Sequence, residues 1–179
     1  EGLSNGETRL NMHVDQNHKS GLQHLCAQGI LYVWSSTVEL ASTTAVWPRS
    51  HTDVYDELMK DAFAIENGRR QPLLTAASQS VPLNTFCDFD RHEKLLSRAL
   101  QDTRRVPCPA GSLLVYDSRL LHQACEGGPR LAQPVCWQPK RHRSKEALLR
   151  KLFCCITGLP TSHSSVEGRV HDLAWRGIP

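Results

Sequence analysis

One segment past the middle of the chain constrains the fold more than any other. It begins with a turn that contains proline and glycine, Val106 to Gly111, and it leads into an apolar run, Leu113 to Tyr116. Pro and Gly favour turns, and a short aliphatic and aromatic run after such a turn is typical of a strand. Because the run has no polar residue at alternate positions, the sequence predicts a strand that is buried on both faces.

Other parts of the chain predict further strands and a few helices. Strands are expected at Cys26–Val38 and at Leu131–Trp137, the second closed by Pro139. The predicted helices cover residues 52–66, 91–102 and 145–157. Several short strands with peripheral helices favour a mainly β fold, a sandwich or barrel.

Four short signals give the expected helix ends. Thr52 or Asp53 is a suitable N-cap for the first helix, and Ser144 for the third. Gly158 would end the third helix, because glycine adopts the left-handed conformation common after a helix.

Composition excludes several classes of protein. The chain of 179 residues fits a single domain, 1–179, and its formal net charge of +3 is too small to indicate a nucleic-acid protein by itself. We expect no membrane span, because no run of about 18 apolar residues occurs. The seven cysteines include no C-x-x-C pair, which argues against a zinc ribbon. Reduced, buried thiols are the simplest interpretation, and they predict an intracellular, reducing compartment, cytoplasm or nucleus.

Three residues could converge on a metal ion. In an extended segment His13 and Asp15 point to the same side, and His122 follows the apolar strand. Two imidazoles and one carboxylate on one face of a metal form the facial triad of non-haem Fe(II) oxygenases. Arg130 starts the next strand, where a guanidinium can clamp a dicarboxylate.

These residues belong to longer motifs that resemble the phytanoyl-CoA dioxygenase-like family of Fe(II)/2-oxoglutarate-dependent oxygenases. The similar segments are H-V-D-Q at 13–16, P-R-S-H at 48–51, P-A-G-S-L-L-V-Y-D-S-R-L-L-H at 109–122 and R-L-A-Q-P-V-C-W-Q-P at 130–139. The resemblance implies a double-stranded β-helix, also called a jelly-roll or cupin-like fold. It also implies Fe(II) as cofactor, 2-oxoglutarate and O2 as cosubstrates, and ascorbate as a candidate reductant.

The resemblance assigns a role to each candidate residue. His13, Asp15 and His122 would bind the iron and form the catalytic centre. Arg130 would bind the C5 carboxylate of 2-oxoglutarate, although its spacing of eight residues from His122 is shorter than in the family. Gln28 would lie near the cosubstrate or, alternatively, hydrogen-bond to the backbone. The implied reaction is hydroxylation of an organic substrate with release of succinate and CO2.

The resemblance also implies how the chain is organised. It covers roughly residues 10–60 and 105–160, so 61–104 is predicted to be an insertion and 144–158 a C-terminal helix. In the family a sizeable segment precedes the H-x-D motif, whereas here twelve residues do. We therefore expect the C-terminal part of a jelly-roll, completed by an N-terminal segment or a second chain.

Two alternatives to a small-molecule or lipid-like substrate remain open. An Fe(II) oxygenase acting on a methylated nucleobase would use a basic surface, and Lys140–Arg143 is a candidate for phosphate contact or a solvated loop. A non-catalytic jelly-roll binding module is the other alternative. Less specific candidates are Ser50 and His51, Asp117 as a partner that orients a ligand histidine, and His18, His163 and His171, which have no informative pattern around them.

Overall fold

The computed structural model describes residues 13–16, 26–37, 41–60, 81–82, 101–125, 127–137, 139–142 and 144–158. His18, His163 and His171 therefore lie outside the described residues, as does most of the predicted insertion at 61–104. The same holds for the predicted helix at 91–102, except for its last two residues, which are helical.

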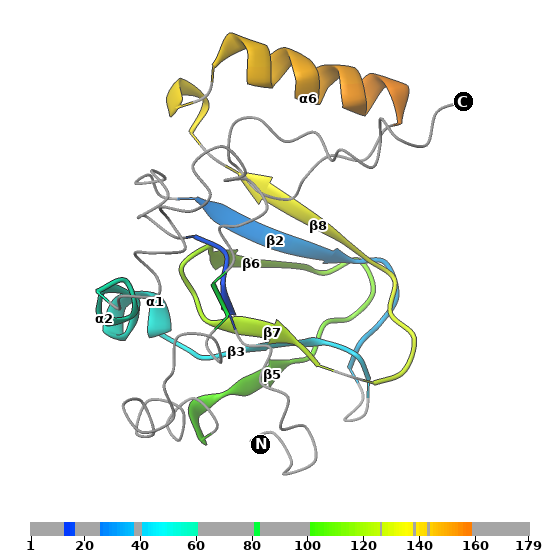
Figure 1. Cartoon of the computed structure of the whole chain (residues 1–179). Helices are drawn as coiled ribbons and strands as arrows, with labels where there is room; N and C mark the ends of the chain where they lie inside the picture. Colours follow the sequence, from blue (N-terminus) through cyan, green and yellow to red (C-terminus); the bar gives the residue numbers. More distant parts are fainter. Residues whose placement is uncertain are drawn as a thin grey trace.

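The described part of the chain is mainly β, as predicted, and it forms two antiparallel sheets (Figure 1). In spatial order, the five-stranded sheet contains β4 (Val81–Pro82), β1 (His13–Val14), β7 (His122–Ala124), β3 (Thr44–Val46) and β5 (Arg104–Val106). The three-stranded sheet contains β6 (Leu113–Asp117), β2 (Ala27–Tyr32) and β8 (Ala132–Trp137). Figure 1 draws β8, β2 and β6 above β7, β3 and β5.

Strand β2 is shorter than the predicted strand Cys26–Val38. It ends at Tyr32, and the chain then bends at Val33 and Trp34. Beyond the bend Ser36 exchanges two backbone hydrogen bonds with Cys108, at N···O distances of 2.7 and 3.0 Å. The chain has therefore left the three-stranded sheet. By contrast, β8 agrees with its prediction to within one residue.

The expectation that β6 is buried on both faces is wrong. Leu113 and Val115 are 47% and 53% exposed, because both side chains point to the outer face of the three-stranded sheet. The inner face is the buried one, and it carries Gln28 and Tyr32 of β2. The apolar run therefore does not mark a strand enclosed between two layers.

Glycine at position 29 allows β2 and β8 to pack closely. A Cβ atom added to Gly29 would lie 2.9 Å from the carbonyl oxygen of Leu114 and 2.9 Å from Cζ3 of Trp137. Real Cβ atoms do not approach backbone oxygens so closely, so the indole of Trp137 rests where a side chain of residue 29 would be. Only glycine fits without a shift of the neighbouring strands.

The first predicted helix, 52–66, is broken into two short helices within the described residues. These are α1 (Ser50–Asp53) and α2 (Tyr55–Leu58), separated at Val54. The predicted N-caps are wrong: the N-cap is Arg49, in the left-handed conformation with φ of 65° and without a side-chain capping bond. The turn at Pro48 and Arg49 starts the helix earlier than the acidic residues suggested.

The C-terminal helix agrees with the sequence prediction. Helix α6 covers Lys145–Thr157 and follows a 3-10 turn, η2 (Lys140–His142). The N–H of Leu148 donates to the carbonyl of Ser144 (3.2 Å), which places Ser144 at the N-cap position. Gly158 has φ of 69°, so glycine suits the residue after the helix. Within the described residues, none of the helices has the length and apolar content that crossing a bilayer needs.

Candidate metal centre

The pairing of β1 with β7 brings together residues that are far apart in the sequence. His13 lies opposite His122 in the antiparallel register, and their ring centroids are 4.5 Å apart. Asp15 follows β1, and its backbone N–H donates to the carbonyl of Ser118 (3.0 Å). Two strands and one backbone hydrogen bond therefore direct two imidazoles and one carboxylate to one point.

The carboxylate of Asp15 lies between the two imidazoles. Its Oδ1 is 3.4 Å from Nε2 of His13, and its Oδ2 is 3.3 Å from Nε2 of His122. One potential ligand atom from each residue lies within 4.8 Å of the other two. This donor set fits the facial arrangement that iron(II) accepts in oxygenases, since it leaves the remaining coordination positions open.

The backbone fixes which nitrogen of His122 faces the other two residues. Nδ1 lies 2.9 Å from the carbonyl oxygen of Leu120, which can only accept a hydrogen bond. Nδ1 therefore carries a proton, which leaves Nε2, the atom directed at Asp15, as the ring nitrogen that a bound metal would take in place of a proton. A second ring nitrogen bonded to a carbonyl is the usual arrangement of a metal-binding histidine.

Ser50 holds the segment that leads into β7. Its hydroxyl donates to the carbonyl of Trp47 (2.8 Å) and accepts from the N–H of Leu121 (2.8 Å), the residue before His122. Ser50 is buried, so these bonds are shielded from water. The P-R-S-H motif thus supplies a hydroxyl that caps the backbone, while His51, also within the described residues, is half-buried and has an Nδ1 atom without a hydrogen-bond partner.

Asp15 remains ionised despite its burial. Burial alone would raise the pKa of its carboxyl, but hydrogen bonds with His122 and His13 and their charges outweigh this effect and hold the pKa well below 3.8. Among the three candidate metal ligands, Asp15 therefore carries a negative charge at neutral pH. A carboxylate is the form in which aspartate binds a metal ion.

Tyr116 packs against the candidate metal centre. Its ring centroid is 4.8 Å from that of His122. Burial, followed by the negative charge of Asp15, raises the pKa of the phenol well above its usual value, while the charge of Arg130 opposes this. Tyr116 is therefore a neutral phenol, and the charges of Asp15 and Arg130 act on its pKa in opposite directions.

Arg130 carries an unpaired donor toward the interior. Its Nη1 atom is buried and has no hydrogen-bond partner among the described residues. The guanidinium carbon lies 5.9 Å from the ring centroid of Tyr32, whose hydroxyl is hydrogen-bonded to Oγ1 of Thr44 (2.8 Å). A buried guanidinium N–H without an acceptor is costly, which favours an anionic ligand at this position.

Gln28 lies on the inner face of β2, opposite Tyr116 on β6 and Cys136 on β8. Its side chain is buried, and Oε1 has no hydrogen-bond partner among the described residues. The alternative role for Gln28, a hydrogen bond to the backbone, would therefore rest on its Nε2 group and not on Oε1. A buried amide oxygen facing the interior suits contact with a bound molecule or water.

The proposed orienting role of Asp117 is wrong. Its carboxylate accepts hydrogen bonds from Nε of Arg119 (2.9 Å), from Nη2 (2.7 Å) and from the backbone N–H of the same residue (2.9 Å). Burial would raise the pKa of Asp117, but the bonds from Arg119 lower it. The carbonyl of Leu120 orients His122 instead.

Two tyrosines near the site were missed by the sequence reasoning. Tyr116 and Tyr32 were assigned only to strands, although both face the interior. Strand alternation could have identified Tyr116, because it lies opposite Gln28 and on the other face from Val115. No sequence signal pairs Tyr32 with Arg130, since that contact depends on the packing of two distant segments.

The cysteines form no disulfide within the described residues. Cys26, Cys108, Cys125 and Cys154 are buried, Cys136 is partly buried and Cys155 is exposed. Burial raises the pKa of the Cys108 and Cys125 thiols, so neither is an activated nucleophile.

Comparison with known proteins gives limited similarity. The chain is 38% identical over 56 residues to the "Ava biosynthesis cluster protein O" of Aspergillus versicolor. The aligned segment is 30% of this chain and 18% of the relative, so it spans only a small part of the relative's length. No family model and no solved structure matches the chain.

Proposed function

We propose that this chain carries the catalytic centre of an Fe(II)/2-oxoglutarate-dependent dioxygenase that hydroxylates an organic substrate. The observation that carries the proposal is the convergence of His13, Asp15 and His122, with their ligand atoms within 4.8 Å of one another. Two of the three side chains are held by strand pairing, and His122 also presents the nitrogen that a metal needs.

The three side chains would hold the iron through Nε2 of both histidines and the carboxylate of Asp15. Bound iron(II) would supply the activation of O2 that is coupled to decarboxylation of 2-oxoglutarate to succinate and CO2. The chain's own contribution is to keep Asp15 ionised and to hold His122 in one tautomer through Leu120. The ring of Tyr116 packs against that of His122, with the ring centroids 4.8 Å apart.

Arg130 is the proposed partner of the distal carboxylate of 2-oxoglutarate. Its buried, unpaired Nη1 and its position beside Tyr32 support this role. The spacing of eight residues from His122 is shorter than in the resembling family. However, the charges of both Asp15 and Arg130 act on the pKa of Tyr116, which Asp15 raises and Arg130 lowers. Gln28, whose buried Oε1 also has no hydrogen-bond partner among the described residues, is the second proposed contact for 2-oxoglutarate.

The finer assignment of the fold belongs to the same proposal. Two antiparallel sheets, with β1 and β7 paired at the metal centre, fit a double-stranded β-helix. The substrate is proposed to be a small organic molecule, since the partial relative is named for a biosynthesis cluster. The non-catalytic alternative predicts that the three residues do not converge, so their geometry favours the enzyme.

Anaerobic titration with Fe(II) and 2-oxoglutarate tests the proposal. The chelate of 2-oxoglutarate on protein-bound iron(II) should give a weak charge-transfer band in the visible spectrum. Asp15→Ala and His13→Ala should abolish the band, because each removes a ligand. Arg130→Met should retain Fe(II) binding but lower the affinity for 2-oxoglutarate by about tenfold or more, because it removes a charged hydrogen bond.

Matched controls make the result specific. Asp117→Ala removes a carboxylate that is bonded to Arg119 and not to the histidines, so it should keep the band. No band in a folded wild-type protein, or an unchanged band in both ligand variants, contradicts the proposal. Binding of DNA or RNA that weakens with salt would point to the nucleobase alternative.

A further inference from the structure

Helix α6 presents its apolar side to solvent. Leu149, Leu152, Phe153 and Ile156 are 55%, 54%, 52% and 75% exposed. Their spacing of three, four and seven residues places them on one stripe of the helix. Cys154, on the opposite side, is 1% exposed. The helix therefore turns its apolar stripe outward, the reverse of the usual arrangement in a globular protein.

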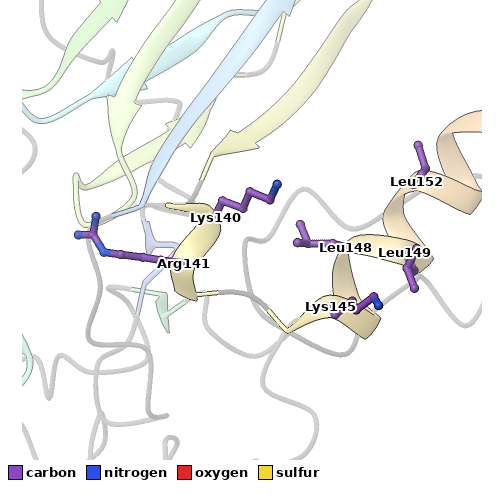
Figure 2. A pocket seen from close by; sticks show the side chains of 6 residues that line it. All are labelled: Lys140, Arg141, Lys145, Leu148, Leu149 and Leu152. Carbon is purple, nitrogen blue, oxygen red and sulfur yellow. The ribbon is translucent and has the colours of Figure 1, made fainter.

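A cationic hollow adjoins this stripe. It has a volume of about 700 Å³ and lies between η2 and α6. Figure 2 shows its six lining side chains, with Lys140 extending from η2 toward Leu148 of the helix. The lining residues are Lys140, Arg141, Lys145, Leu148, Leu149 and Leu152. Lys140 and Arg141 come from η2, whereas Lys145 lies on α6 beside Leu148 and Leu149, so the hollow combines cations with leucines.

The local charge is strongly positive. Residues 140–151 contain six basic residues and one acidic residue, namely Lys140, Arg141, Arg143, Lys145, Arg150 and Lys151 against Glu146. Within the described part of the chain, none of the ion pairs involves Lys140, Arg141 or Lys145. Cations at the positive end of the helix dipole destabilise a helix, so helix stability does not account for them.

We propose that the stripe on α6, together with η2, docks on a membrane surface that contains anionic phospholipids. A basic end beside an apolar stripe is the pattern of helices that lie in the plane of a bilayer interface. The cations would contact phosphate or carboxylate headgroups, and Leu149, Leu152, Phe153 and Ile156 would enter the acyl boundary. The helix lies on the surface and does not cross the bilayer, in keeping with its 13 residues. None of these residues belongs to the proposed metal centre.

Vesicle flotation with the full chain tests the proposal. The protein should float with vesicles of phosphatidylcholine and phosphatidylserine, and it should not float with phosphatidylcholine alone. The triple substitution Lys140→Gln, Arg141→Gln and Lys145→Gln should lower binding by about a hundredfold, at about fivefold for each cation. Raising the salt concentration should also lower vesicle binding, because salt screens the headgroup charge.

The apolar part has its own variant and control. Leu152→Gln with Ile156→Gln should lower binding by about tenfold or more, since both lose burial in the acyl region. Leu131→Gln changes a residue of similar exposure outside the helix and should leave binding unchanged. Circular dichroism checks that each variant is folded.

Four results would overturn the proposal. The first is no flotation with anionic vesicles at low salt by the folded protein. The second is equal flotation with neutral and anionic vesicles, and the third is full binding by the Leu152 and Ile156 variant. The fourth is a dimer in light scattering that the same variant dissociates, without vesicle binding, since a second copy would then cover the stripe.

Discussion

At the scale of single residues, Ser50 connects the helical segment to the candidate metal centre. The Ser50→Ala variant leaves the N–H of Leu121 without its acceptor, and the carbonyl of Trp47 loses the hydroxyl but keeps the backbone N–H of Ser50 (3.3 Å) as a donor. Because Leu121 is buried in the protein, we expect the free energy of unfolding to fall by about 1–3 kcal/mol. We also expect weaker Fe(II) binding, since Leu121 precedes His122. Urea unfolding and anaerobic metal titration measure the two effects.

Thr52→Ala is the matched control for this hydroxyl. Thr52 lies two residues away and donates to the carbonyl of Arg49 (2.8 Å), but its side chain is exposed, so water can replace the bond. Its removal should change the free energy of unfolding by less than about 0.5 kcal/mol. If Ser50→Ala unfolds at the same urea concentration as the wild type, the connection through Leu121 is unimportant.

At the scale of strands and helices, Gly29 controls the contact between β2 and β8. Gly29→Ala places a Cβ atom against the carbonyl of Leu114 and the indole of Trp137. The backbone oxygen cannot move aside as a side-chain end can, so we expect a loss of about 1–3 kcal/mol in the free energy of unfolding. Thermal or urea unfolding measures it.

Gly128→Ala provides the comparison for Gly29. A Cβ atom at position 128 meets no heavy atom within 4 Å, and the backbone there does not need a positive φ. This variant should stay within about 0.5 kcal/mol of the wild type. Equal stability of the two alanine variants would show that β2 and β8 shift apart easily.

The sequence predicted the elements whose signals are local. The bounds of α6 followed from the N-cap Ser144 and from Gly158, and the end of β8 followed from Pro139. The exposure of Leu113 and Val115 could not be predicted, because it depends on what covers the sheet and not on the strand's own residues. The early start of α1 could not be predicted either, because its N-cap is Arg49 in the left-handed conformation, and arginine is not a usual capping residue.

The candidate site was predictable to a similar degree. The spacing of His13 and Asp15 and the place of His122 after a strand were sufficient to select them, but the residues that support them were not. Ser50 acts through the backbone of Leu121, and that contact spans 71 positions of sequence. Such contacts become visible only after the strands have been paired.

At the scale of the whole molecule, we expect the free energy of unfolding to fall at acid pH because Asp117 becomes protonated. Its pKa is lowered in the folded protein, so the bond with Arg119 contributes fully above the usual value near 3.8. The contribution disappears as the pH falls through the lower, folded-state pKa. Because Arg119 is about one-third exposed, we expect about 1 kcal/mol, lost below about pH 4 and absent from Asp117→Asn. Urea unfolding at a series of pH values measures this difference.

Asp53→Asn is the control for the pH series. Asp53 pairs with Arg49 at 3.2 Å, but the two side chains are 42% and 78% exposed. Water screens such a pair, so the variant should follow the wild-type pH dependence closely. A parallel pH dependence of Asp117→Asn and the wild type would exclude the bond with Arg119 as a source of acid sensitivity.

The pairing of β1 with β7 also determines when the three candidate ligands can come together during protein synthesis. His13 and His122 are 122 − 13 = 109 residues apart, so the ribosome releases the first two ligands long before the third. Until His122 emerges, the nascent chain offers only His13 and Asp15 to a metal. Contacts of such long range also close late in folding, because the loop between them must first be ordered. A metal held by all three side chains, as proposed above, would therefore bind only after β1 and β7 have paired within the five-stranded sheet.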